Sequence, residues 1–471
     1  MFGEILPFGL LAFCLIPVAF VCYSVIPAAT SPLRNVPGPF LARFTRLWFF
    51  QSTWRGQAHW ENIHLHRKYA PAGSFYAPVV RLGPNLYSIS RPESVVYGIS
   101  SKMPKTSFYN TFKHPDMEPG LLAHRNIRKH AEMRRKFQSM YSMSSLLRYE
   151  KYVETTQDVF QQRLGEMVKS GKTVNMHRWI QCYAFDVVGN ITYNKRFGFL
   201  DEGKDIDHAL SSLHAQTVYG TLAGIYSWAH PILYRILEQM PGSGAAGRTF
   251  LMKFAQRRVS EREIERAAEE KDGKRHIPAD GAPRDFLDLA IDAERDPEKN
   301  MTKFDVFAVG LANILAGSDT TAISLSSVFW HLTTTPRAMQ RLRAELDQAI
   351  AEGKMLGHFF PEGTEIGINS WVAHYDEDIW GSDATSFKPE RWIESDAAKL
   401  KLMDSYFMPF GLGSRTCIGR HISMLEMCKV IPMVISQFDF DLVDRMERFE
   451  TVDIFLVKPK DFRVVVRARS Q

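Results

Sequence analysis

The longest run of apolar positions in the chain stands at its N-terminus. Residues 5–26, ILPFGLLAFCLIPVAFVCYSVI, contain no charged residue and are long enough to cross a bilayer as one helix. A cleaved signal peptide is the alternative, because Ala28 and Ala29 offer small residues for cleavage. The run exceeds a normal signal core and no Lys or Arg precedes it, so we predict a retained membrane anchor.

The residues around this run predict its orientation and a hinge. Three arginines follow the run and one glutamate precedes it: Arg34, Arg43, Arg46 and Glu4. This asymmetry predicts that the body of the protein lies on the cytoplasmic side. Prolines at 32, 37 and 39 stiffen an extended segment between membrane and body. We therefore expect an anchor with the start of the hinge over residues 1–30, and one domain over residues 31–471.

Within the body, the spacing of apolar residues separates strands from helices. Residues 77–90, APVVRLGPNLYSIS, predict two short strands joined by a Gly-Pro turn. Residues 130–199 show helical periodicity with interruptions near Gly171 and Asn194. The charge-dense residues 261–277 fit a solvated helix and loop better than a binding site.

The clearest predicted helix covers residues 304–332, FDVFAVGLANILAGSDTTAISLSSVFWHL. It is apolar or small almost all round, which indicates a helix buried in a large protein. A second membrane span is the alternative, but Asp319 and several hydroxyls occupy its middle, where a charge in lipid is costly. Because hydroxyls can bond back to carbonyls of the preceding turn, we expect a local interruption and a polar notch beside Gly317.

Composition and charge narrow the class of protein. The chain has 471 residues, is 45% hydrophobic and 23% charged, and so has the balance of a globular protein with a large core. Its net charge of +6 is spread along the chain without a long basic block, which argues against a nucleic-acid binder and fits a membrane surface or an acidic protein partner. Five cysteines without repeated spacing indicate neither a disulfide framework nor a zinc site, and favour a reducing compartment.

One cysteine lies in a setting that a core thiol does not need. In residues 410–419, FGLGSRTCIG, Cys417 has glycines on both sides and Arg415 two positions before it. Apolar residues then recur at helical spacing, so Cys417 stands at the entrance of a helix, where free N–H groups and the helix dipole favour a thiolate. The glycines leave room for something flat. A structural cysteine and a cysteine nucleophile are the alternatives, although no histidine–acid partner stands out for the latter.

Two motifs together resemble those of the cytochrome P-450 superfamily. The pattern F-x-x-G-x-R-x-C-x-G, met by Phe410 to Gly419, is similar to that family's haem-ligand loop. The pattern A-G-x-D-T-T, met by residues 316–321, is similar to its oxygen-activation helix and precedes the cysteine, as in the family. The segment FKPERW at 387–392 and the texture of the chain resemble members from filamentous fungi. This resemblance implies a mainly α fold with small β-sheets (α+β), with haem between the oxygen-activation helix and the cysteine loop.

The resemblance also implies roles for individual residues. Cys417 would be the axial thiolate of haem b and its only protein ligand to iron, which favours O–O cleavage. Thr320 would hold the oxygen being activated and Asp319 would relay protons. The residues expected to hold the cofactor are Cys417, Arg415, Arg134, Phe410, Gly411 and Gly419. Of these, Arg415 and Arg134 would pair with the haem propionates. Arg134 stands where the family has Trp-x-x-x-Arg, with His130 in the Trp place.

Partners follow from the same resemblance. Electrons would come from NADPH through a separate NADPH-cytochrome reductase, attracted by a basic face around Lys129, Arg135 and Lys136. The expected location is the endoplasmic reticulum membrane, with a single span and a cytoplasmic catalytic domain. The leading hypothesis is a monooxygenase that oxidises a lipophilic small molecule in fungal specialised metabolism. The alternatives are a reductase-independent haem-thiolate isomerase or dehydratase, and an inactive member that keeps only a haem- or lipid-binding shell.

One family element is missing from its expected place. Members carry E-x-x-R on a helix before FKPERW, where the Glu and Arg lock onto the arginine that matches Arg391. No glutamate between Asp319 and Cys417 has an arginine three residues later, and the matches at Glu132 and Glu263 lie upstream. We expect a deletion near residues 355–358, from a lost exon or a degenerate gene. It would leave Arg391 without partners, at about 3–5 kcal/mol for an unpaired buried charge, and predicts poor folding or haem binding.

Overall fold

The computed structural model describes residues 25–30, 33–72, 74, 76–90, 104–142, 149–271, 285–352, 370–411, 416–443, 450–454 and 456–469. The predicted anchor, Arg415 and the expected deletion near 355–358 lie outside these residues, apart from the last two positions of the apolar run. The chain divides into two compact units. Unit 1 comprises residues 1–100, 365–386 and 390–409, and unit 2 the remainder, which includes both motifs.

Unit 1 is a small mixed α/β unit. Its hairpin pairs Val79 with Ile89 in antiparallel register, so the two strands predicted over residues 77–90 are confirmed. Leu65 of α4 packs with Ala77 and Val80 in a small core beneath the hairpin. The elements of unit 1 are α2 (Ile26–Thr30), η2 (Phe40–Arg43), α3 (Leu47–Trp54), α4 (Ala58–Lys68), β1 (Val79–Gly83), β2 (Leu86–Ile89), α17 (Ser370–His374), α18 (Glu377–Trp380), α19 (Arg391–Glu394) and α20 (Ala397–Tyr406).

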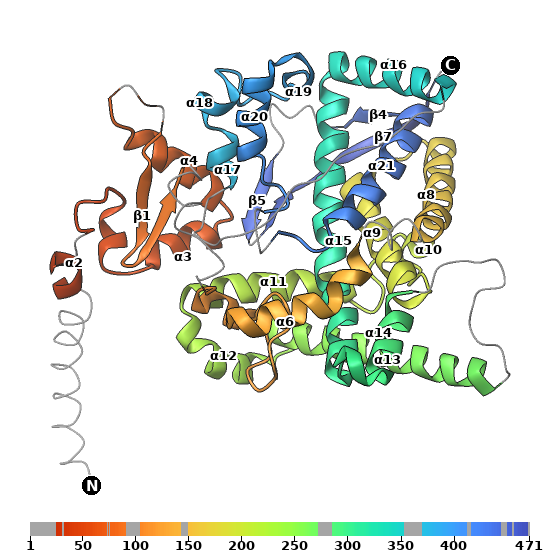
Figure 1. The fold of residues 1–471 in the computed structure, drawn as a ribbon. Helices are drawn as coiled ribbons and strands as arrows, with labels where there is room; N and C mark the ends of the chain where they lie inside the picture. The colour runs from red at the N-terminus through yellow and green to blue at the C-terminus, as the bar shows by residue number, and fades with distance from the viewer. Residues whose placement is uncertain are drawn as a thin grey trace, which may run out of the picture. The chain divides into compact units, whose positions relative to one another are not determined.

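Unit 2 is mainly helical and holds the large core (Figure 1). Its helices are η3 (Ser107–Phe112), α6 (Ile127–Gln138), η4 (Ser139–Tyr141), α8 (Glu150–Ser170), α9 (Met176–Tyr193), α10 (Phe199–Glu202), α11 (Ala209–Ile225), η6 (Ser227–Ala229), α12 (His230–Leu237), α13 (Gly244–Lys271), α14 (Phe286–Arg295), η7 (Pro297–Lys299), α15 (Lys303–Thr334), α16 (Pro336–Glu352) and α21 (Arg420–Gln437). Its strands are β3 (Val174–Asn175), β4 (Phe438–Leu442), β5 (Thr451–Ile454), β6 (Leu456–Pro459) and β7 (Arg463–Ala468). The mainly α fold with small antiparallel sheets is therefore confirmed.

The long helix α15 is the predicted apolar helix, and it passes through the core beside α9 and α21 (Figure 1). A capping box fixes its start, since the Thr302 hydroxyl accepts from the Asp305 N–H and the Asp305 carboxylate accepts from the Thr302 N–H. Gly317 allows a close approach to α9, because a Cβ there would meet a Val188 methyl at 2.5 Å. The helix is long and apolar enough to cross a membrane, but it is mostly buried in the protein, as a core helix would be.

Two small sheets lie at the C-terminal end of the chain. Strand β7 pairs antiparallel with both β3 and β4, which joins the start of α9 to the end of α21. Strands β5 and β6 form a separate hairpin in which Val452 pairs with Lys458. The predicted breaks near Gly171 and Asn194 are confirmed, because both residues adopt the left-handed conformation that ends α8 and α9.

Candidate active site

Cys417 stands at the entrance of α21. Its N–H donates to the carbonyl of Phe410 at 2.9 Å, which closes the turn that leads into the helix. Gly411 adopts a positive φ of 68° in this turn, a conformation that favours glycine. Gly419 is the N-cap residue of α21, two positions after Cys417. The predicted position of the cysteine at a helix N-terminus is therefore confirmed.

The residue Cys417 is exposed to solvent, although protein groups lie close enough around its sulfur to desolvate it in part. Burial raises the pKa of the Cys417 thiol, and the Gly419 backbone N–H acts in the opposite direction. The guanidinium groups of Arg134, from α6, and Arg420, from the first turn of α21, also act to lower this pKa. The backbone N–H and the two cations therefore act to lower the pKa of the Cys417 thiol, as expected. Burial has the larger effect, so the net result is a raised pKa.

These features fit a ligand that carries a metal ion, such as the haem that the sequence predicts. A Cβ at Gly419 would lie 3.9 Å from the Cys417 sulfur, so glycine leaves the surface beside the sulfur clear. A Cβ at Gly411 would meet nothing within 4 Å. A metal ion would supply the positive charge that a coordinating thiol needs to lose its proton. Arg134, half-buried near the sulfur, is placed to pair with an acidic group on such a ligand.

Thr320 is exposed on α15. Its hydroxyl donates to the carbonyl of Ala316 at 2.7 Å, one turn earlier. The hydroxyl therefore makes the back-bond that the sequence predicts. The expected local interruption is wrong, since α15 is a continuous α-helix from Lys303 to Thr334. The hydroxyl back-bonds of α15 are accommodated without loss of helical geometry. Ala316 and Thr320 are both exposed on one face of the helix.

Asp319, the neighbouring residue, is buried on another face of α15. One carboxylate oxygen accepts from the Gln181 side-chain amide of α9 at 2.6 Å. The other carboxylate oxygen pairs with the Lys458 ammonium of β6. Asp319 and Thr320 are thus adjacent in sequence, but their side chains lie in different environments: one is buried and ion-paired, and the other is exposed.

Two histidines lie near this ion pair. Burial is the main cause that lowers the pKa of His177 to about 4; Asp319 opposes this and Lys458 adds to it. One ring nitrogen of His177 lies 2.9 Å from the Ser326 hydroxyl of α15. His214 of α11 is exposed, and its pKa is lowered by partial desolvation and then by Lys458. Both imidazoles are therefore neutral near pH 7, and Lys458 carries the charge opposite Asp319.

The two motif helices are bonded to each other. The Thr321 hydroxyl on α15 lies 2.9 Å from the Ser423 hydroxyl on α21. Tyr141, from η4, lies close enough to Cys417 for the sulfur to add to burial in raising the Tyr141 pKa, and its hydroxyl donates to the Asn313 side chain at 2.5 Å. The structure thus brings the helix of Thr320, the entrance that holds Cys417 and the arginine of α6 into one region. Arg415 lies outside the described residues.

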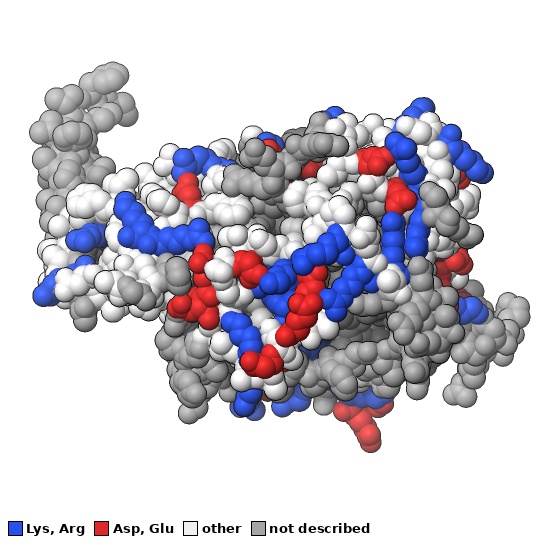
Figure 2. All heavy atoms as spheres, turned by 90° about the horizontal axis from the view of Figure 1, so that it is seen from above, with Lys and Arg blue, Asp and Glu red and all other residues white. Residues whose placement is uncertain are grey.

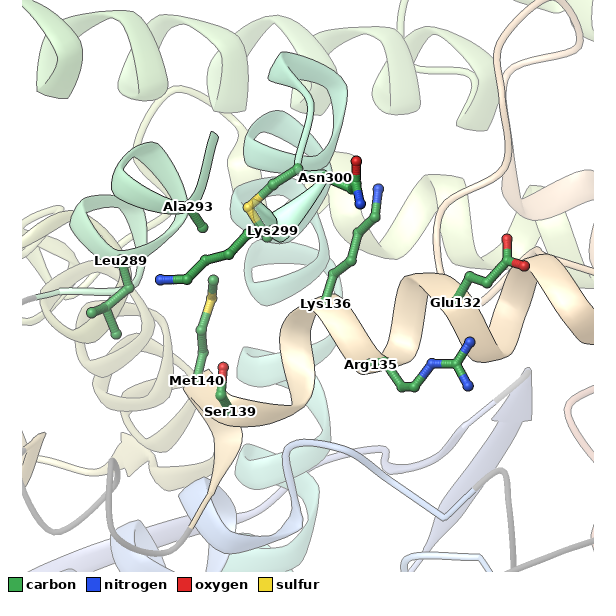
Figure 3. A pocket seen from close by; sticks show the side chains of 10 residues that line it. Glu132, Arg135, Lys136, Ser139, Met140, Leu289, Ala293, Lys299 and Asn300 are labelled. Carbon is green, nitrogen blue, oxygen red and sulfur yellow. The ribbon is translucent and has the colours of Figure 1, made fainter. Parts of the chain in front are cut away.

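A cavity of about 570 Å³ opens near α6 on the side of α14 and the segment after it. Figure 3 shows Lys299 extending between Leu289 and Met140, with Arg135 and Glu132 at the other end. Cys417 and Thr320 do not line it. Lys136, at its edge, pairs with the buried Asp305 at 2.7 Å. This cavity is therefore separate from the thiol site, and one of the three expected partner-facing cations is already engaged.

The charges on the surface show which of the expected cations are exposed to an acidic protein partner. On the face drawn in Figure 2, basic and acidic side chains are interspersed. Lys129 and Arg135 are exposed on α6, and neither forms an ion pair with any residue that the structure describes. These two residues keep the charge that could attract an acidic partner.

The expectation that Arg391 lacks partners is wrong. Its guanidinium pairs with the Asp383 carboxylate at 3.1 Å. It also donates to three backbone carbonyls, those of Trp380, Asp383 and Ser386. All of these groups belong to unit 1. The loop after α18 therefore satisfies this cation locally, and the cost of an unpaired buried charge does not arise.

Sequence reasoning missed several residues of the site. Arg420 could have been found, because it is the first residue of the helix that Cys417 enters. No sequence pattern predicts that Lys458 and Gln181 contact Asp319. Each is about 140 positions from Asp319, and neither belongs to a recognisable motif. Only the folded chain brings them together.

Comparisons with known proteins show the family to which the chain is related. The family model described as cytochrome P-450 matches residues 95–356 and 352–466, so the match breaks in two where the sequence predicts a deletion. A cytochrome P-450 monooxygenase of Aspergillus terreus is 32% identical over 86% of this chain and 90% of that protein. A pisatin demethylase of Fusarium vanettenii is 31% identical over 97% of this chain and 95% of its own length. The cytochrome P-450 monooxygenase pkfB of Emericella nidulans is 30% identical over 96% of both chains.

Proposed function

This chain belongs to the cytochrome P-450 family, and on that premise we propose that it is a haem-thiolate monooxygenase acting on a lipophilic small molecule of fungal specialised metabolism. The observation that carries the proposal is the exposed thiol of Cys417 at the entrance of α21, with Arg134 and Arg420 beside it. It is supported by the exposed Thr320 on the helix bonded to α21.

Cys417, Arg134 and the glycine-bounded turn would hold haem b, with Arg415 as a further propionate partner. The bound haem would supply the iron at which O2 is reduced, and the Cys417 thiolate would bind that iron and donate electron density to it. The Phe410 carbonyl, through its bond to the Cys417 N–H, fixes where the sulfur stands. The Gly419 N–H and Arg420 stabilise negative charge on that sulfur.

Thr320 and Asp319 would handle the protons of the reaction. The Thr320 hydroxyl is exposed and can exchange its bond to the Ala316 carbonyl for a bond to a water molecule that carries a proton. Asp319 is the nearest acid in sequence, but it is buried and paired with Lys458. Its participation therefore requires a rearrangement of that pair or a connecting water.

The proposed partners follow from the same chemistry. A membrane-bound NADPH-cytochrome reductase would deliver electrons, and Lys129 and Arg135 offer exposed positive charge to its acidic surface. The apolar N-terminal run would hold the protein on the endoplasmic reticulum membrane with the body in the cytoplasm. Among the relatives, the pisatin demethylase is consistent with a small organic substrate.

A second candidate is an inactive member of the family. The broken family match at residues 352–356 favours it, because an element expected before FKPERW is then missing from the chain. Even without that element, Arg391 has a nearby ion-pair partner in Asp383, which favours a folded protein. A reductase-independent isomerase is less favoured, since Asp319 and Thr320 are both retained.

The reduced, carbon-monoxide-bound absorption spectrum of the 471-residue chain in microsomes tests the proposal, with Cys417→Ser as the control. We expect a thiolate-type Soret band that the control lacks, and NADPH-dependent turnover when a reductase is added. A band without reductase-dependent turnover would favour the isomerase. No band, with a folded protein, would favour the inactive member, and the transcript across codons 350–360 would then be sequenced.

A further inference from the structure

The cavity of about 570 Å³ beside α6 has a wall of apolar side chains. Met140 from η4, Ala293 from α14 and Met301, just before α15, are all buried, and Leu289 of α14 lines the cavity with them. Figure 3 shows the side chain of Lys299 extending between Leu289 and Met140. Small-molecule sites usually measure about 300–1,000 Å³ and combine apolar walls with a few polar groups. This cavity has both features.

Four charged side chains also line the cavity, three cations and one carboxylate: Arg135, Lys136, Lys299 and Glu132. Two of these charges already have close partners of opposite sign. Lys136 pairs with the buried Asp305 at 2.7 Å. The Glu132 carboxylate accepts from Arg128, one turn earlier on α6, at 3.1 Å. The carboxylate that lines the cavity is therefore engaged outside it, and two cations remain.

The two remaining cations, Arg135 and Lys299, come from different elements. Lys299 lies 3.6 Å from Asp296, and 61% and 38% of these two side-chain surfaces are exposed, so this pair contributes little. Arg135 forms no ion pair with any residue in the part of the chain that the structure describes. The cavity thus combines an apolar wall with positive charge that the described residues do not neutralise.

We propose that this cavity is a second binding site, separate from the thiol site, for an amphipathic monoanion with one short apolar chain and one carboxylate. The chain would lie against Met140, Ala293 and Met301, where it leaves water. The carboxylate would accept from the Arg135 guanidinium, whose planar donors match its two oxygens, and from the Lys299 ammonium. An inorganic anion would leave the apolar wall uncovered, and a neutral molecule would leave Arg135 unpaired. Because Cys417 and Thr320 do not line the cavity, binding here does not require haem.

Calorimetric titration of the purified 471-residue chain, in a neutral detergent with detergent alone as the blank, tests the proposal. The probes are octanoate, octan-1-ol and inorganic phosphate, which carry both features, the apolar chain alone and the charge alone. We expect saturable octanoate binding, with octan-1-ol and phosphate binding at least about fivefold more weakly. Failure of octanoate to bind, or equal binding of octanoate and either control probe, would overturn the proposal.

Substitutions locate the bound octanoate. Arg135→Met and Lys299→Met each remove one exposed cation and should each weaken octanoate binding about fivefold, without changing the binding of octan-1-ol. Lys303→Met removes an exposed cation at the start of α15 that does not line the cavity, and should bind octanoate as the parent does. If Arg135→Met and Lys299→Met both keep the parent affinity, octanoate binds elsewhere, such as beside the haem, and the proposal is wrong.

A third substitution tests the apolar wall. Ala293→Leu adds side-chain volume on the cavity wall and should weaken both octanoate and octan-1-ol, with circular dichroism as the check that the variant is folded. Unchanged octanoate affinity in a folded Ala293→Leu chain would contradict the proposal. If this variant does not fold, the two exposed cation substitutions still decide. A chain without a carbon-monoxide band would fail the proposed function, while these titrations would still measure this site.

Discussion

Two buried groups of charges in unit 2 differ in what surrounds them. Between α13 and α14, Arg262 contacts the carboxylates of Asp285 at 3.1 Å and Asp288 at 2.9 Å, and all three side chains are nearly inaccessible. Between α15 and β6, Asp319 pairs with one cation among the described residues, Lys458. The first group joins two consecutive helices, whereas the second joins a helix to a hairpin 139 residues away and adjoins an exposed hydroxyl. Burial of charge alone therefore does not identify a functional site; the neighbouring exposed chemistry does.

The α13–α14 group also corrects an expectation. Residues 261–277 read as a solvated helix and loop, yet Arg262 and Arg266 are buried. Asp285 is the N-cap of α14 and accepts from the Asp288 N–H at 2.9 Å, so the group fixes where that helix begins. Arg266 donates to the Asp288 carbonyl at 3.0 Å. These bonds act within the scaffold, and Thr320 and Cys417 are absent from them.

The largest expected effect comes from breaking this scaffold group. Arg262→Met leaves two carboxylates facing each other without their shared cation, and the free energy of unfolding should fall by about 3–5 kcal/mol. Denaturant unfolding of the purified chain measures it. The pH profile of turnover should keep its shape at a temperature where the variant is folded, because the group includes neither Thr320 nor Cys417. A shifted profile would contradict the distinction between the two groups.

The matched control is Arg257→Met on the same helix. Arg257 is about half exposed and lies 3.5 Å from the exposed carboxylate of Asp207. Exposed ion pairs contribute about 0–1 kcal/mol, so this variant should unfold almost as the parent does. A loss as large as that of Arg262→Met would mean that the helix, rather than the buried group, is sensitive to substitution.

A smaller effect concerns pH. Burial, and then Asp288, raises the pKa of Asp285 to about 7, above its value of about 4 in the unfolded chain. In this window the native state holds more protons than the unfolded state, so the contribution of Asp285 to stability is greatest at low pH and is lost as pH rises from about 4 to about 7. Asp285→Asn should remove this slope from the stability–pH curve. Equal slopes in parent and variant between pH 4 and 7 would contradict the prediction.

The sequence predicts the positions of the two motif residues better than it predicts the partners of the buried charges. The position of Cys417 at a helix entrance and of Thr320 on a buried apolar helix follow from local patterns, since glycine spacing and apolar periodicity act over a few residues. The partners of Asp319 and Arg391 could not be predicted. Lys458 and Asp383 are charged residues without any distinguishing sequence pattern. Lys458 reaches Asp319 from a distant strand and Asp383 reaches Arg391 from a loop, so only the tertiary structure shows these pairs.

The smallest effect concerns another buried carboxyl group, that of Glu426 on α21, which sharpens the comparison because it has no hydrogen-bond partner among the described residues. Both of its oxygens are buried without a hydrogen bond to any described residue, and burial raises its pKa well above the usual value, which favours the uncharged form. Asp319 forms an ion pair with Lys458, whereas no cation among the described residues pairs with the buried Glu426.

We therefore expect Glu426→Met, which keeps the side-chain length and removes two unsatisfied oxygens, to raise the free energy of unfolding by about 1 kcal/mol. Denaturant unfolding at pH 7 measures the change, and Glu426→Gln, which keeps a buried polar group, should show no such gain. Asp319→Met, in contrast, strands the Lys458 ammonium and should destabilise the chain. If Glu426→Met were destabilising to a similar extent, Glu426 would have a partner that stabilises it, and the two carboxyls would belong to the same class.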